Sequence, residues 1–161
     1  KCDWSSDVCS SDLTPALHES DHTHDGFEWL IANDVQNSVF AWLRKGTTPN
    51  TIVLVVANLT PNPHAQYTIR VPKTGIWFER LNTDATVYGG TGMGNMGQAL
   101  ASTMVLPSPA PSESIAVDTT TEAPTTIETY RPTTTDTAVQ LTVCLPPLAT
   151  LIFEWSGQEN T

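Results

Sequence analysis

Apolar and polar residues follow the pattern of β-strands along most of the chain. Residues 52–59 form a nearly continuous apolar run (IVLVVANL), which predicts a strand buried on both faces. Residues 67–71 and 76–81 alternate instead, as half-buried strands do, and turn residues separate the runs. The predicted strands cover residues 27–32, 39–45, 52–59, 67–71, 76–81, 138–145 and 148–155.

Residues 98–106 form a further short apolar run, whose pairing the pattern leaves open. With this run the chain has about eight strands and hardly any helical period. Eight short strands joined by turns predict an all-β domain, either a sandwich or a barrel. A chain of 161 residues is long enough for one such domain with a real core.

Two segments do not fit the strand pattern. Residues 1–13 contain a near-repeat of Ser-Ser-Asp and resemble translated sequencing-adapter DNA, so we interpret them as an artefactual leader or a short disordered extension. Residues 107–137 consist largely of Thr and Pro, and few of their side chains could join a core. We predict a disordered insert there, because such a composition does not offset the entropy cost of ordering a chain.

Charge and cysteine content narrow the possible partners and the cellular setting. The net charge of -10 and only seven Lys and Arg residues argue against nucleic acid or an anionic membrane as partner. No apolar run reaches the roughly 20 residues that span a bilayer, and the N-terminus lacks the apolar core of a signal peptide. Three cysteines do not make a disulfide framework, so we expect a cytoplasmic setting.

Residues 18–22 spell the zinc-protease pattern H-E-x-x-H. That chemistry needs a helix that presents both histidines on one face, together with a third ligand. Pro15 lies just upstream, and the Ser and Asp residues within the motif are poor helix formers. We therefore interpret this stretch as a polar surface connection, and we predict no metal.

Gly92-x-Gly94-x-x-Gly97 matches the dinucleotide-binding fingerprint. A Rossmann loop needs a buried strand before it, a helix that opens within it, and a parallel strand after the helix. Here a short apolar run and then the Thr/Pro-rich insert follow the glycines, so no β-α-β unit can form. We predict no nucleotide and no cofactor.

Several motifs carry a family resemblance: residues 15–21 (PALHESD), 26–29 (GFEW), 38–45 (SVFAWLRK), 58–61 (NLTP), 75–84 (GIWFERLNTD), 88–95 (YGGTGMGN) and 145–150 (LPPLAT). In this order along the chain, they resemble bacterial 1,4-α-glucan (glycogen) branching enzymes. The resemblance covers about residues 14–155, except for the insert, where related sequences have only a short linker.

The resemblance implies a partial chain from the α-amylase superfamily. It makes residues 14–25 the end of the catalytic barrel domain and a linker, and residues 26–161 the C-terminal β domain, an antiparallel β-sandwich. The catalytic Asp and Glu of such enzymes lie on the barrel, which is missing here. We therefore expect no catalytic residue and no activity in this chain, and we expect the barrel and α-glucan as its partners.

Aromatic rings are the candidates for contact with glucan, because sugars stack their apolar CH faces on such rings. We predict Trp29, Trp77 and Tyr88 as possible glucan contacts, and we assign Trp42 and Trp155, in the centres of strands, to the core. The alternative function is a stand-alone carbohydrate-binding β module without catalysis. A purely structural domain of another α-amylase relative is a third possibility.

Overall fold

The computed structural model describes residues 14–48, 50–105 and 137–157. The predictions for residues 1–13 and for the insert therefore fall almost entirely outside the described residues. The described residues form eight strands joined by turns, and three single turns of 3₁₀ helix. The strands are β1 (Phe27–Asp34), β2 (Val39–Lys45), β3 (Ile52–Asn58), β4 (His64–Arg70), β5 (Gly75–Asn82), β6 (Gln98–Val105), β7 (Thr137–Leu145) and β8 (Thr150–Trp155). The helical turns are η1 (Pro15–Leu17), η2 (His24–Gly26) and η3 (Thr86–Tyr88).

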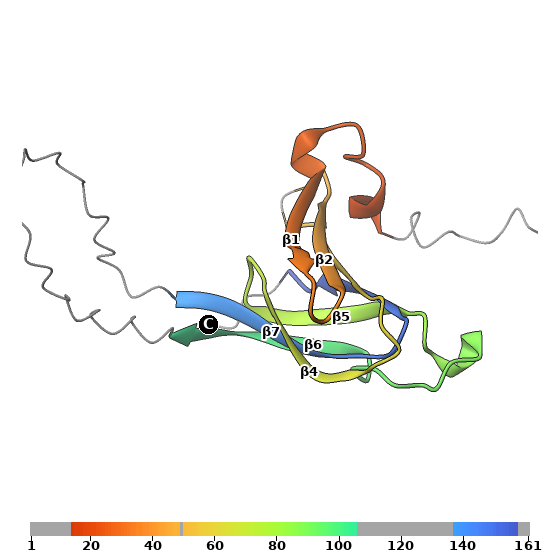
Figure 1. Ribbon diagram of the computed structural model, residues 1–161. Helices are drawn as coiled ribbons and strands as arrows, with labels where there is room; N and C mark the ends of the chain where they lie inside the picture. The colour runs from red at the N-terminus through yellow and green to blue at the C-terminus, as the bar shows by residue number, and fades with distance from the viewer. Residues whose placement is uncertain (1–13, 49, 106–136, 158–161) are drawn as a thin grey trace, which may run out of the picture.

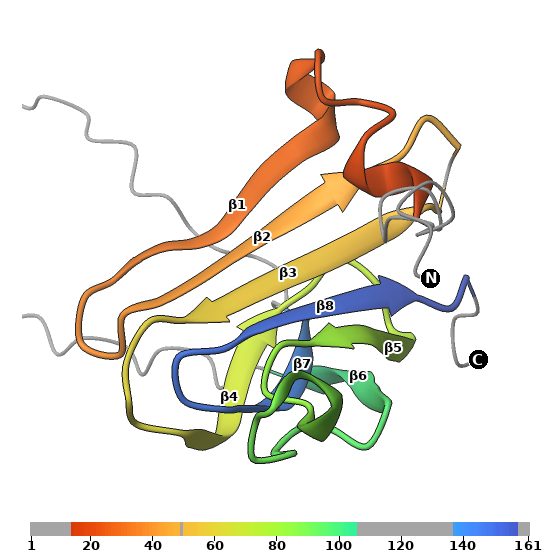
Figure 2. The ribbon, with the colours of Figure 1, turned by 90° about the vertical axis from the view of Figure 1, so that its right-hand side faces the viewer.

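All eight strands belong to one antiparallel sheet in the order β1-β2-β3-β8-β5-β6-β7-β4. Figure 1 shows β1 and β2 crossing over the strands β4 to β7, so that the sheet turns back on itself. The predicted all-β fold of about eight antiparallel strands is confirmed. The two layers are halves of a single sheet, because β8 pairs with β3 on one side and with β5 on the other (Figure 2).

The core lies between the two halves and follows the alternation of each strand. On β2 the side chains of Val39, Ala41 and Leu43 are buried, while the residues between them face outward. β8 alternates in the same way and buries Phe153 and Trp155. The prediction that Trp155 belongs to the core is confirmed.

β3 is buried on both faces, as its continuous apolar run predicts. One face, with Leu54 and Val56, belongs to the main core. The other face, with Val53 and Val55, is covered by Ala16 of η1. The segment before β1 is therefore packed against the outside of the sheet and is part of the fold.

Candidate functional site

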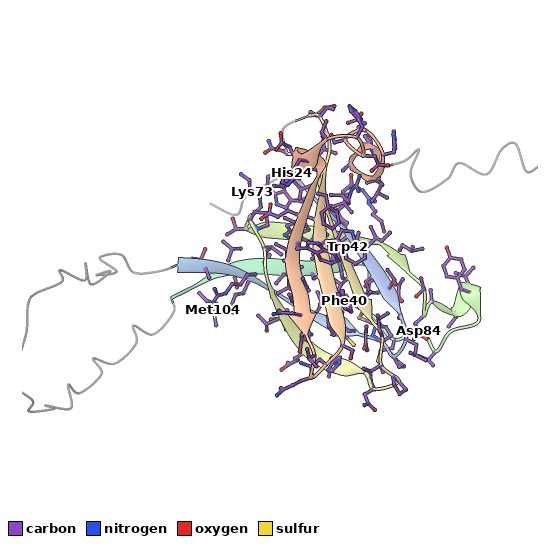
Figure 3. All side chains as sticks on the ribbon, turned by 45° about the horizontal axis from the view of Figure 1, so that its top comes forward. His24, Phe40, Trp42, Lys73, Asp84 and Met104 are labelled. Atoms are coloured by element: carbon purple, nitrogen blue, oxygen red, sulfur yellow. The ribbon has the colours of Figure 1, made fainter. Side chains whose placement is uncertain are left out.

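Four aromatic side chains of β1 and β2 gather on the outer face of the sheet, and we call them the β1–β2 aromatic cluster. Strand register places Trp29 opposite Trp42, with ring centroids 5.7 Å apart and planes at 68°. The ring of Phe27 lies 5.1 Å from that of Trp29, and the ring of Phe40 lies 6.3 Å from it. Figure 3 shows Phe40 and Trp42 along β2. Edge-to-face contacts of this kind hold the rings in fixed orientations.

Trp29 keeps 53% of its surface exposed although three rings surround it. The neighbouring Glu28 forms an ion pair of 2.5 Å with Lys45, but the alternation along β1 and β2 places this pair on the other face of the sheet. An oriented, half-exposed indole supplies the apolar ring on which a sugar could stack. The indole of Trp29 is therefore accessible to a sugar, and its contact with glucan stays a prediction.

The prediction that Trp42 belongs to the core needs refinement. Its ring is half-buried and packs with the small outer cluster of Ala16, Val53 and Val55 on the outside of the sheet. It thus links the aromatic cluster to the segment that precedes β1.

Polar contacts fix the segment before β1 to the β2–β3 hairpin. The carboxylate of Glu19 accepts hydrogen bonds from the backbone N–H of Thr47, at 3.1 Å, and from its hydroxyl, at 2.9 Å. These bonds hold the pKa of Glu19 below its usual value. Arg44 of β2 pairs with Asp21. Glu19 thus serves as a positioning group in a turn.

Residues 18–22 form turns, where a zinc-protease motif would need a regular helix. Within residues 14–48, 50–105 and 137–157, His, Cys, Asp and Glu nowhere gather in a group of three that could hold a metal ion.

Trp77 corrects one of the three predicted glucan contacts. Its side chain is 0% exposed and lies in the main core, where its indole N–H donates to the carbonyl of Lys73 at 3.3 Å. A fully buried ring has no face for a sugar, so the prediction of a contact at Trp77 is wrong. The alternation along β5 placed Trp77 on one face correctly, but it did not indicate which face is the inner one.

The loop of residues 83–97, which we call the glycine loop, connects β5 to β6. The Asp84 carboxylate accepts hydrogen bonds from the N–H and the hydroxyl of Thr91, at 3.0 and 2.5 Å, and from the N–H of Met93 at 3.2 Å. The hydroxyl of Thr91 is the main cause of the lowered pKa of Asp84. The side chain of Asn82 bonds the N–H of Asp84 and the carbonyl of Met93. The polar side chains of the loop therefore bond the loop itself.

The glycine loop closes an antiparallel hairpin, since β6 pairs with β5 directly. A dinucleotide loop would instead lead into a helix and a parallel strand. Tyr88 lies on η3 within this loop with 65% of its surface exposed. Its ring is accessible, and its contact with glucan stays a prediction.

A shallow hollow of about 460 Å³ lies on the β5–β6 hairpin, and sequence reasoning missed it. Its lining is mainly apolar: Ile76, Gln98, Ala99 and Leu100. The only signal for it was the apolar run at residues 98–106, whose pairing the pattern left open. None of the predicted glucan contacts lines this hollow.

In the described part of the chain no helix is long and apolar enough to cross a membrane.

Comparison with known proteins agrees with this geometry. The family model described as the alpha amylase C-terminal all-beta domain matches residues 29–156. A 1,4-alpha-glucan branching enzyme of Cupriavidus pinatubonensis is 42% identical over 146 residues, which are 90% of this chain and 16% of that protein. Enzymes of the same name from Nitrobacter winogradskyi and Rhizobium etli are 53% and 57% identical over 58% and 54% of the chain, and 13% and 12% of their own lengths.

The chain thus spans between 12% and 16% of the length of these relatives. The matched residues run from the exposed Trp29 of β1 to just past the end of β8, and so include β2 to β8 in full and most of β1. The resemblance read from the motifs is confirmed. The chain belongs to the family of C-terminal all-β domains of α-amylases, in the form found in 1,4-α-glucan branching enzymes.

Proposed function

We propose that this chain is part of an enzyme that cleaves α-1,4-glucan segments and re-attaches them as α-1,6 branches during glycogen synthesis. One observation carries the proposal: a branching enzyme is 42% identical over 90% of the chain. A retaining transfer of this kind needs two carboxyl groups about 5 Å apart in a cleft, commonly on a barrel of about 250 residues. We assign those groups to the larger part of the parent enzyme, and no catalytic step to this domain.

The first role of the domain is to support the catalytic barrel. The outer face formed by η1, β2, β3 and β8 is suited to this role, because the half-buried side chains of Leu17, Trp42 and Ile152 leave apolar surface there around a small buried cluster. Thr14, the first described residue, directly precedes η1 and so lies at this same face. An apolar face beside the point of connection is a natural surface for a neighbouring domain.

The second role is contact with α-glucan at the β1–β2 aromatic cluster. Trp29 is half-exposed, and the rings of Phe27 and Trp42 contact it edge to face. A ring held in this way loses little freedom when a sugar stacks on it, which favours binding. We also propose a cytoplasmic setting for the enzyme.

Migration through a native gel that contains glycogen tests the glucan contact. We expect the chain to be retarded relative to a gel without glycogen, and Trp29→Ala to lose most of that retardation. Leu148→Ala is a matched control, because Leu148 is also exposed but lies outside the aromatic cluster. Equal migration of the chain in both gels would leave only the supporting role.

A stand-alone carbohydrate-binding module is the second candidate, and the exposure of Trp29 favours it equally well. The DNA upstream of the codon for Thr14 separates the two functions. An open reading frame that encodes the barrel with its catalytic Asp and Glu supports the branching enzyme. A secretion signal at that position would instead support the separate module.

A further inference from the structure

The glycine loop is fixed by its own polar side chains. Asp84, Thr91 and Asn82 bond one another or the loop backbone, as described above. At the end of the loop, Asn95 donates to the carboxylate of Glu79 at 2.8 Å and accepts from the N–H of Cys144 at 2.7 Å. The loop is therefore joined to β5 and β7 and has a defined shape without any ligand.

Apolar side chains of this loop point away from the domain. Val87 is 81% exposed, Tyr88 is 65% exposed, and Met96 is completely exposed. The only charged residue within residues 83–97 is Asp84, whose carboxylate is already bonded. In a chain of net charge -10, a segment with exposed aliphatic, aromatic and Met side chains and one internally bonded charge has the composition of a protein interface.

The chemistry of the loop favours a protein surface over a sugar. A glucan needs free polar groups for its hydroxyls beside any ring on which it stacks. Two polar side chains of the loop, Asp84 and Thr91, are bonded to each other. Val87 and Met96 expose apolar side chains that are not aromatic. A sugar stacks on a flat aromatic ring, so these two side chains suit a protein partner better.

We propose that the glycine loop docks onto another domain of the same parent polypeptide, through Val87, Tyr88 and Met96. This proposal rests on the proposed function, in which the chain is one part of a longer enzyme. The relatives are far longer than this chain, which covers 12% to 16% of them. Covalent linkage gives a neighbouring domain an effective concentration of about the millimolar range, which favours it over a second copy. A loop already ordered before docking also loses little entropy on binding.

Hydroxyl-radical footprinting tests this docking on two proteins: the 161-residue chain and the full-length enzyme encoded by the complete gene. We expect the oxidation rates of Tyr88 and Met96 to fall at least about fivefold in the full-length enzyme, because interface centres exclude water. Val35 is equally exposed at the β1–β2 turn, so Val35→Ser is the control for Val87→Ser. We expect Val87→Ser, but not Val35→Ser, to restore oxidation of Met96 in the full-length enzyme.

Three results would overturn the proposal. Oxidation of Tyr88 and Met96 at the same rate in both proteins would show that no domain covers the loop. Protection that grows with protein concentration would assign the loop to contact between two copies. Protection that appears only with added maltoheptaose would assign it to glucan, as the sequence predicted for Tyr88. Each result is separate from the branching activity of the full-length enzyme, which tests the proposed function itself.

Discussion

The hydroxyl of Tyr67 donates a hydrogen bond of 2.6 Å to the carboxylate of Asp34. Tyr67 lies on β4 and Asp34 ends β1, and these are the two edge strands of the sheet. No ladder joins the two edges within the described residues, because β1 pairs with β2 and β4 with β7. A single side-chain bond thus helps to bring the ends of the sheet together, where open edges would otherwise favour aggregation.

Replacing Tyr67 with Phe removes this bond and keeps the ring. We expect Tyr67→Phe to lower the free energy of unfolding by about 1–2 kcal/mol, because the acceptor is charged and partly buried. Urea denaturation followed by tryptophan fluorescence measures the change. Tyr88→Phe is the control, and a loss of equal size there would argue against the account of Tyr67.

The same pair makes stability depend on pH in the acidic range. The hydroxyl of Tyr67, followed by the amide of Asn37, holds the pKa of Asp34 below its usual value. A depressed pKa in the folded state stabilises the protein above the unfolded value of about 4, and this stabilisation is lost as pH falls through the folded value. We therefore expect the difference in unfolding free energy between wild type and Tyr67→Phe to shrink between about pH 7 and pH 3. A difference that grows toward low pH would contradict this.

Alanine substitutions at two neighbouring glycines of the glycine loop distinguish the cost of backbone strain from the cost of a steric clash. Gly89 has φ of 83° and open space where a side-chain carbon would lie, so Gly89→Ala should cost about 1 kcal/mol. A Cβ at Gly90 would lie 2.2 Å from the carbonyl oxygen of Asp84, which the fold cannot move easily. We expect Gly90→Ala to cost clearly more than Gly89→Ala in thermal unfolding. The reverse order would mean that the loop is not held as described.

Asn58 is fully buried and its amide is fully bonded. Its Nδ2 donates to the carbonyls of Asn62 and Pro146, and its Oδ1 accepts from the N–H and the hydroxyl of Thr60. An aspartate in this place would lose both donors and set a carboxylate against two carbonyl oxygens. We therefore expect Asn58→Asp to cost at least about 2 kcal/mol, and to cost more as pH rises and the carboxyl ionises.

Chemical denaturation at about pH 5 and about pH 8 measures this change in the free energy of unfolding. Both pH values lie above the usual pKa of Asp. Asn33→Asp, at an exposed position of β1, should have little effect at either pH. Equal stability of wild type and Asn58→Asp at the higher pH would contradict the bonding described for Asn58.

Local patterns predicted much of this fold. The continuous apolar run of β3 required burial on both faces, and η1 supplies the second cover through Ala16. The alternation of β8 placed Trp155 inside.

Contacts between distant parts of the chain were not predictable from such patterns. Tyr67 and Asp34 are 33 positions apart, and nothing local indicates that their strands meet. Trp77 was misjudged because alternation assigns faces without saying which one the rest of the sheet covers. The outward direction of Trp29 likewise depends on the curvature of the whole sheet.

The formation of α-1,6 branches by the full-length enzyme tests the central claim most directly. The complete gene is expressed, the protein is incubated with linear α-1,4-glucan, and new branches are counted as chains released by a debranching enzyme. We predict that the full-length enzyme forms branches, that Trp29→Ala forms them more slowly at low glucan concentration, and that the 161-residue chain alone forms none. Linear glucan left without new branches by the full-length protein would contradict the account.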